Sequence, residues 1–216
     1  EKVIYQSTDD RTISPLNAVK SAYGRCGEQS TFTVTALRAA CIPARQCYTP
    51  RWAHSDDNHA WVEVWINGKW RYLGACEPEV KLDVAWFSEP VLRAMLVHTK
   101  AFGRYKGDEK TDQQYTKYAY LNLLEHYAPV KELVVRVSDK DGKPVRDAEV
   151  EYQLYNYAEF YPLSKQITDN SGTSKFTTGY GDLLIWANKG INYAYQKINV
   201  EKTDTVYISL DKKYSL

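Results

Sequence analysis

Hydrophobic and polar positions follow the clearest patterns in two segments of the first third of the chain. Residues 26–41 repeat one face at helical spacing, with alanines between, which predicts a helix that begins at Cys26. Residues 59–66 change face at every position, which predicts a strand, and Asn67-Gly68 then predicts a tight hairpin with a return strand over residues 69–75. One strand face carries His59, Trp61, Glu63 and Trp65, and the other carries Ala60, Val62, Val64 and Ile66.

The pattern changes near residue 129. From Val130 onward, short alternating runs are separated by turn residues, and about seven strands in fewer than ~90 residues are typical of a small β-sandwich. The runs are 133–137, a turn and re-entry over 139–145, 148–155, 174–178, 183–187, 194–200 and 205–210. We therefore predict an α+β fold with two domains, residues 1–128 and an all-β sandwich over residues 129–216.

The predicted helix places the thiol of Cys26 at its N-terminus. The unpaired N–H groups and the dipole there favour an anion, so a thiolate is expected to form more easily at this position. Gly27 has no side chain that would block a reacting carbonyl. Because buried, unreactive cysteines are commoner, the thiol alone is a weak signal, and His59 at the start of the next strand supplies the second candidate group.

Four sequence blocks occur in an order that resembles the transglutaminase-like superfamily, and within it the core of the cytosolic peptide:N-glycanases. The blocks are Cys26-Gly27-Glu28, residues 38–45, residues 59–64 and Trp70. The resemblance covers roughly residues 14 to 80. It implies a papain-like core in which a Cys, a His and an Asp attack an amide, with Cys26 as the nucleophile and His59 as the base. The paired Cys-x-x-Cys zinc ligands of peptide:N-glycanases are missing from this sequence.

The third member of that triad has no plain counterpart. Counting from Trp70 puts Gly74 in the acid's place, whereas counting back from the next proline puts Glu77 there. In an unbroken hairpin register Glu77 points away from His59, but a bulge at Gly74 or the following alanine would turn it onto the same face. We predict that Glu77 takes the acid's role; the alternative is a surface glutamate before a loop.

Aromatic residues near the predicted thiol site are candidates for a substrate cleft. Two share the strand face of His59, and one lies in the polar loop of residues 49–58, which is expected to overhang the thiol. These candidates are Trp52, Trp61 and Trp65, with Trp86-Phe87 as a further pair. For all of them the alternative is ordinary core packing.

Composition excludes several classes of function. A net charge of +1 without a basic run argues against nucleic acid as the main partner, and no apolar stretch is long enough to span a membrane. The four cysteines lack metal-ligand spacing, so we predict no metal and no cofactor. Cys41 either forms a disulfide with Cys47 or Cys76 or, as we favour, stays a buried free thiol. Because the chain begins at Glu1 without an initiating Met, we expect a fragment or a processed protein.

The last part of the chain carries a second resemblance. The turn around Asp141-Gly142 and the strand and turn residues that follow it, up to Gly172, resemble carboxypeptidase regulatory-like or prealbumin-like domains. Such domains are structural or adhesive modules, and the resemblance therefore implies a secreted, periplasmic or cell-surface protein.

Together these features predict thiol-dependent hydrolysis or acyl transfer at an amide of a peptide, protein or glycoprotein, through a thioester on Cys26. Either water or an amine can resolve such a thioester, and we favour hydrolysis. Two alternatives stay open. One is a binding or scaffold module whose active site is retired, and the other is a carbohydrate-binding protein, indicated only by the high Tyr and Trp content. The sequence predicts no oligomeric state.

Overall fold

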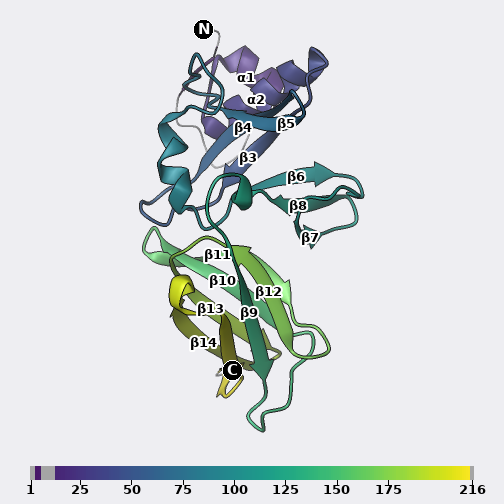
Figure 1. The fold of residues 1–216 in the computed structure, drawn as a ribbon, viewed down its shortest axis with the longest axis vertical. Coiled ribbons are helices and arrows are strands. Elements are labelled where there is room, and N and C mark those ends of the chain that lie inside the picture. Colours follow the sequence, from purple (N-terminus) through teal and green to yellow (C-terminus); the bar gives the residue numbers. More distant parts are fainter. Residues whose placement is uncertain (1–2, 6–12, 215–216) are drawn as a thin grey trace.

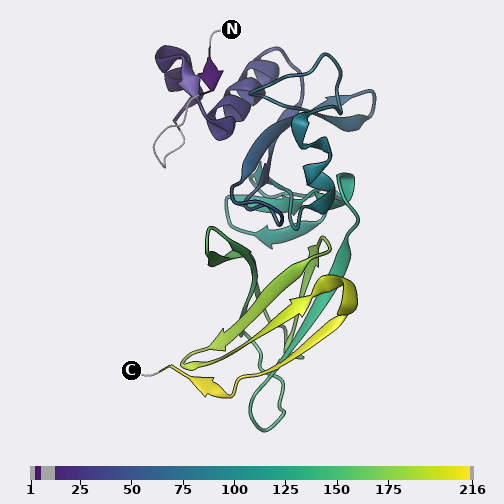
Figure 2. The ribbon, with the colours of Figure 1, turned by 90° about the vertical axis from the view of Figure 1, so that its left-hand side faces the viewer.

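A computed structural model describes residues 3–5 and 13–214. The predicted domains also include residues 1–2, 6–12 and 215–216, which lie outside the described part. An N-terminal part, up to residue 130, and a C-terminal part, from residue 131, lie end to end along the long axis of the molecule (Figure 1). The side view shows the chain passing from one part to the other in the segment that leads into β9, Lys131–Ser138 (Figure 2).

Two helices and a six-stranded sheet form most of the N-terminal part. Helix α2 (Cys26–Ala39) packs against strands β3 and β4, and the shorter α1 (Pro15–Ser21) packs against α2. The strand order across the sheet is β5-β4-β3-β6-β8-β7. The bounds are β3 Ala44–Thr49, β4 His59–Ile66, β5 Lys69–Leu73, β6 His98–Phe102, β7 Thr111–Gln114 and β8 Tyr118–Asn122. Short elements are β1 Ile4–Tyr5, which pairs parallel with β2 Tyr23–Gly24, and the 3-10 helices Trp86–Ser88, Pro90–Arg93 and Leu124–His126.

The start of α2 is fixed by its own first turn. The Glu28 carboxylate accepts a hydrogen bond from the backbone N–H of Arg25 at 2.7 Å, and the Gln29 side chain donates to the carbonyl of Gly24 at 3.0 Å. A carboxylate in this position satisfies an N–H that the helix leaves unpaired and interacts favourably with the dipole. The predicted helix start at Cys26 is confirmed.

The β4–β5 hairpin has the predicted register. Trp65 faces Trp70 and Val62 faces Leu73 across the two strands. The return strand, however, ends at Leu73, two residues before the predicted end at residue 75. The chain leaves the sheet at Gly74, so the predicted bulge at this position is wrong.

The two faces of β4 pack into different clusters. Val62 and Val64 join Val34 of α2 in one buried cluster, whereas Trp61 lies in another that includes Phe87. This division confirms the predicted alternation of faces, and it places His59 on the same side of the sheet as Trp61.

Two sheets make up the C-terminal part. Their strand orders are β11-β10-β13-β14-β16 and β12-β9-β15. Side chains from both sheets meet in one buried cluster, for example Val135 of β9, Phe176 of β12, Tyr152 of β10 and Ile185 of β13. The remaining bounds are β10 Glu149–Asn156, β11 Glu159–Ile167, β12 Thr173–Thr178, β13 Asp182–Lys189, β14 Asn192–Asn199, the 3-10 helix Val200–Lys202, β15 Thr205–Ser209 and β16 Lys212–Lys213.

One long strand of this part was not predicted. β11 contains Pro162, and the β10–β11 register shifts between Tyr152 and Gln153, so its alternation is interrupted. The turn that joins the two strands is Tyr157-Ala158, and both residues have positive φ, 51° and 58°. Neither is a Gly, Asn or Asp, which are the usual sequence signals of such a turn. β7 of the N-terminal part was likewise not predicted.

The two parts share buried contacts. Met95 of the N-terminal part is fully buried in the C-terminal cluster, and its carbonyl accepts a hydrogen bond from the Thr178 hydroxyl at 2.7 Å. The Asn122 side chain donates to the carbonyl of Thr177 at 2.8 Å. Gly179 permits this approach, because a Cβ there would overlap the carbonyl oxygen of Ala94. The N-terminal sheet is therefore held firmly against the C-terminal part.

Candidate active site

Cys26 and His59 line one cavity of about 800 Å³. Cys26 is the first residue of α2, and His59 is the first residue of β4, so two separate elements bring them together. The backbone of Ala60 lies close enough to the Cys26 sulfur to lower its pKa, which places the thiol near the start of β4. The volume is in the range of small-molecule and peptide-binding clefts.

Aromatic rings surround the imidazole of His59, which is 6% exposed. The ring-centroid distances are 6.5 Å to Trp52, 5.9 Å to Trp61, 4.8 Å to Trp86 and 5.1 Å to Phe87. Burial lowers the pKa of His59 to about 4, against a smaller opposite effect of the Asp57 carboxylate. The imidazole is therefore neutral at physiological pH and able to accept a proton.

The thiol of Cys26 is also in its neutral form. Burial raises its pKa above the ordinary value; hydrogen bonds from the N–H groups of Ala60 and Gly27 lower it, and the charges of Asp57 and Glu28 raise it further. The predicted stabilisation of a thiolate at the helix N-terminus is thus outweighed by desolvation. The resting pair consists of a thiol and a neutral imidazole.

Glu77 lies on the wall of the same cavity but does not bond to the buried imidazole nitrogen. Burial raises the pKa of its carboxyl group, and a hydrogen bond with the side chain of Trp86 partly offsets this. The Nε2 atom of His59 is buried and has no hydrogen-bond partner. The chain folds back after β5, so a Cβ on Gly74 would lie 3.1 Å from the Glu77 carbonyl oxygen. The Cys26-His59-Glu77 triad is therefore not connected as predicted.

The predicted cleft residues have different positions. Trp52 lines the cavity, and so does Trp86. Trp61 is fully buried, and its indole N–H donates to the Tyr127 hydroxyl at 2.9 Å. Trp65, 43% exposed, packs against Trp70 near the far end of β4. Neither Trp61 nor Trp65 contributes to the cavity wall. Trp61 is buried beneath the wall, and Trp65 lies farther along β4.

Cys76 is a second thiol on the cavity wall. Burial raises its pKa to about 12, and the nearby Glu77 and Cys26 add to the effect. It therefore stays protonated at neutral pH. All four cysteines are free thiols, and Cys41 is exposed rather than buried.

The geometry can be compared with known families. Residues 1–75 match the family model of the transglutaminase-like superfamily. This transglutaminase-like segment contains both Cys26 and His59 and ends before Glu77. No curated protein matches the chain. The match supports thiol-dependent acyl transfer or hydrolysis as the class of chemistry, and it does not extend to the C-terminal part.

Several residues on the wall of this cavity were not predicted. Residues 55–58 line the cavity, in agreement with the expectation that their loop overhangs the thiol, and Asp56 and Asp57 were not among the predicted site residues. Tyr157 lines it as well, although it belongs to the C-terminal part. No local signal identifies Tyr157, since its role depends on a contact with a loop about a hundred positions earlier.

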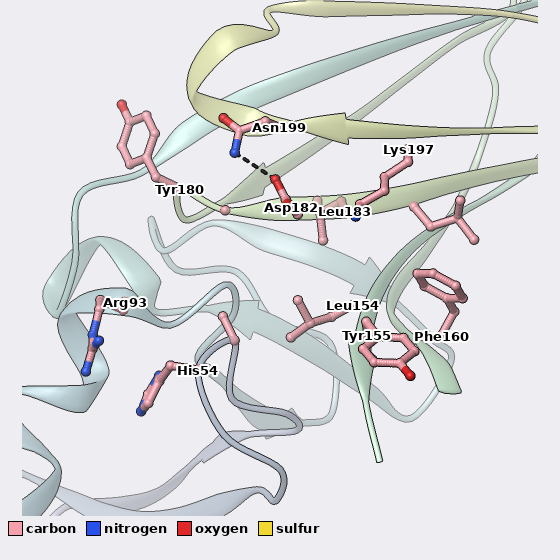
Figure 3. Close-up of a pocket in the computed structure, with 13 residues that line it drawn as sticks. His54, Arg93, Leu154, Tyr155, Phe160, Tyr180, Asp182, Leu183, Lys197 and Asn199 are labelled. Carbon is pink, nitrogen blue, oxygen red and sulfur yellow. Dashed lines mark hydrogen bonds and ion pairs between the residues drawn. The ribbon is translucent and has the colours of Figure 1, made fainter. Parts of the chain in front are cut away.

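A second cavity, of about 690 Å³, lies on the other side of the same loop. Figure 3 shows His54 and Arg93 of the N-terminal part across from Tyr155, Phe160 and Lys197 of the C-terminal strands. The rings of Trp52 and His54 are 5.5 Å apart, so the loop forms the partition between the two cavities.

The described part of the chain has neither a cluster of metal-ligating side chains nor a membrane-spanning helix. Within residues 3–5 and 13–214, no three His, Cys, Asp or Glu side chains come together in the manner of a metal site. No helix among these residues combines the length and the apolar character that a membrane crossing needs.

The raised pKa of Cys26 predicts how its alkylation depends on pH. Because desolvation holds the thiol in its neutral form, the rate with iodoacetamide should keep rising above pH 9.0, the ordinary value, without a plateau at neutral pH. Rates measured on the Cys26 peptide by mass spectrometry check this, with a free peptide of residues 24–31 as the control. A plateau below about pH 7 would instead indicate a thiolate–imidazolium pair.

Proposed function

We propose that the chain is a thiol enzyme that hydrolyses an amide bond of a peptide or protein, with Cys26 as the nucleophile and His59 as the general base. The observation that carries this proposal is the position of Cys26 and His59 on the wall of one cavity. At physiological pH the imidazole is neutral, which is the form in which a general base accepts a proton, and its lowered pKa makes it a weak base.

The proposed reaction begins with the neutral pair. As the Cys26 sulfur attacks the amide carbonyl, its proton passes to His59 and the carbonyl oxygen becomes an oxyanion. The backbone N–H of Cys26, which has no partner within the first turn of α2, is the donor that we assign to this oxyanion. The C–N bond then breaks, the imidazolium gives its proton to the leaving amine, and a thioester remains. Water, deprotonated by His59, releases the acid and restores the thiol.

The aromatic surroundings of His59 favour the second half of this cycle. A pKa of about 4 makes the imidazolium a strong acid, so its proton is readily passed to the amine. We propose that Glu77 acts as a positioning residue, because it lies on the cavity wall beside Trp86, whose ring packs at 4.8 Å against His59. Trp52 and Trp86 are the aromatic residues that we assign to the substrate cleft.

The experiment that tests this function looks for products that depend on Cys26. The full chain is incubated with a mixture of unfolded proteins and peptides, with and without hydroxylamine, and the products are mapped by mass spectrometry. We expect new carboxylates at cleaved amides, hydroxamates when hydroxylamine is present, and neither with Cys26→Ala. Capture of the acyl group by added amines in preference to water would identify a transferase instead.

A binding or scaffold module without catalysis is the second candidate. It is favoured by one observation, the buried Nε2 atom of His59 that no carboxylate contacts. Absence of any product and of any acyl adduct on Cys26 in the same experiment would establish this alternative over the enzyme.

We further propose that residues 1–128 and 129–216 are two domains, the second a β-sandwich of carboxypeptidase regulatory-like or prealbumin-like type. The two sheets that share one buried cluster support this proposal. Location outside the cytoplasm stays a prediction from that resemblance.

A further inference from the structure

The turn between β10 and β11 reaches the loop that precedes His59. Asn156, which is 3% exposed, accepts a hydrogen bond from the backbone N–H of Asp57 at 3.3 Å. Its side-chain amide donates to the carbonyls of Trp52 and Ser55, both at 2.9 Å. Figure 1 shows this end of the C-terminal sheet directed toward the N-terminal part. The buried side chain of Asn156 thus forms hydrogen bonds with the backbone of a single loop through both its oxygen acceptor and its amide donors.

The loop needs this restraint because its backbone is strained. Asp57 has a φ of 117°, a conformation that residues other than glycine rarely adopt. The Trp52 N–H closes the loop by donating to the Asp57 carbonyl at 3.0 Å. His59 follows two positions later, so any change in the loop is transmitted to the imidazole and to the Trp52 ring beside it.

Tyr157 adds two contacts of its own. Its backbone N–H donates to the Asp56 carboxylate at 2.7 Å, and its side chain lines the cavity that contains Cys26. The Arg51 guanidinium lies 4.1 Å above the ring of Tyr161 and 5.6 Å from that of Tyr157, which holds the base of the same loop to the C-terminal strands.

From these contacts we propose that the β10–β11 turn is a working part of the thiol site. Asn156 is a positioning residue that holds the Trp52–Asp57 loop, and thereby His59, in place. Tyr157 is a specificity-determining residue that narrows the cavity on the side where the substrate approaches Cys26. This inference rests on the proposed function, and it gives the C-terminal part a role in selecting peptides with small groups next to the reacting amide.

The test uses two alkylating reagents of different size on the full chain. Iodoacetamide and N-phenylmaleimide are compared on Asn156→Ala, Asn156→Asp, Tyr157→Ala and the control Tyr155→Ala, with labelling of Cys26 measured by mass spectrometry. Tyr155 is on the same hairpin and is similarly exposed, at 60% against 53% for Tyr157, but does not line the thiol cavity.

The two residues should affect different readouts. Tyr157→Ala should raise the ratio of N-phenylmaleimide to iodoacetamide rates about fivefold or more, because a wall is removed, while Tyr155→Ala leaves the ratio unchanged. Asn156→Ala should shift the pH dependence of Cys26 labelling to lower pH, because a loosened loop admits water to the thiol. Asn156→Asp adds a carboxylate that by itself raises the pKa of a nearby thiol, so its readout is the reagent ratio at one pH, which should rise when the loop loosens. Asn156→Asp retains the acceptor and loses the amide donors, so it tests their role should Asn156→Ala fail to fold.

Two results would overturn the inference. One is a reagent ratio in Tyr157→Ala equal to that of Tyr155→Ala, and the other is an unchanged pH profile in folded Asn156→Ala together with an unchanged reagent ratio in folded Asn156→Asp. The proposed function is tested separately, by mapping the amide products that depend on Cys26. If there are none, the enzyme hypothesis is wrong, whatever result the variants of the β10–β11 turn give.

Discussion

Replacing Glu63 by alanine is expected to lower the free energy of unfolding by about 3–5 kcal/mol. Glu63 is 2% exposed and accepts hydrogen bonds from Arg45 at 2.6 Å and from the Tyr127 hydroxyl at 2.5 Å. Without Glu63, the buried guanidinium of Arg45 keeps only Glu109 as a carboxylate partner. The Nη2 atom of Arg45 has no hydrogen-bond partner even when Glu63 is present. An incompletely paired buried charge is far costlier than the loss of a surface pair. Urea denaturation of both proteins measures the difference.

The matched control for this variant is Glu132→Ala. Glu132 is an exposed carboxylate that pairs with Lys175 at 2.9 Å, and its loss should cost no more than about 1 kcal/mol. Similar losses for both variants would show that the Glu63–Arg45 pair is not buried as described.

The contribution of Glu63 should also depend on pH. Burial alone would raise its pKa, but the nearby His126, the charge of Arg45 and the hydrogen bond from Tyr127 lower it below the ordinary value of 4.5. Since the pKa is lower in the folded state, the stabilisation is complete above the ordinary pKa and is lost as the pH falls through the folded value.

This buried network also supports the active site from below. Tyr127 links the Glu63 carboxylate to the indole of Trp61, and the Trp61 ring stacks against His59 at 5.9 Å. Trp61 was predicted to contact the substrate, but it packs against the imidazole of His59 from below instead. Its strand face could be predicted from alternation, but its depth depends on Phe87, which covers it from another segment.

Features that depend on neighbours in sequence could be predicted. The start of α2 at Cys26 and the β4–β5 register follow from a capping residue three positions away and from a two-residue turn. The position of Glu77 could not, because it depends on where β5 leaves the sheet. Asn156 could not be predicted either, since its partners come from the other part of the chain and no pattern in β10 distinguishes it.

The largest effect on activity is expected from His59→Gln, which should lower Cys26-dependent amide hydrolysis by about 10²–10⁴-fold. Glutamine fills much of the same space among the aromatic rings but cannot act as a base near neutral pH. Thermal unfolding should therefore change little, which separates loss of proton transfer from loss of the fold.

The variant Glu77→Gln tests whether Glu77 acts as the third member of a catalytic triad. Because Nε2 of His59 is unpaired and Glu77 lies beside Trp86 on the cavity wall, this variant, which keeps the side-chain oxygen acceptor, should lose less than about tenfold of the activity. If Glu77 instead moved onto the imidazole when substrate binds, its loss would approach that of His59→Gln. The ratio of the two defects, measured on one substrate at one pH, therefore distinguishes a dyad supported by an aromatic wall from a triad that forms only with substrate.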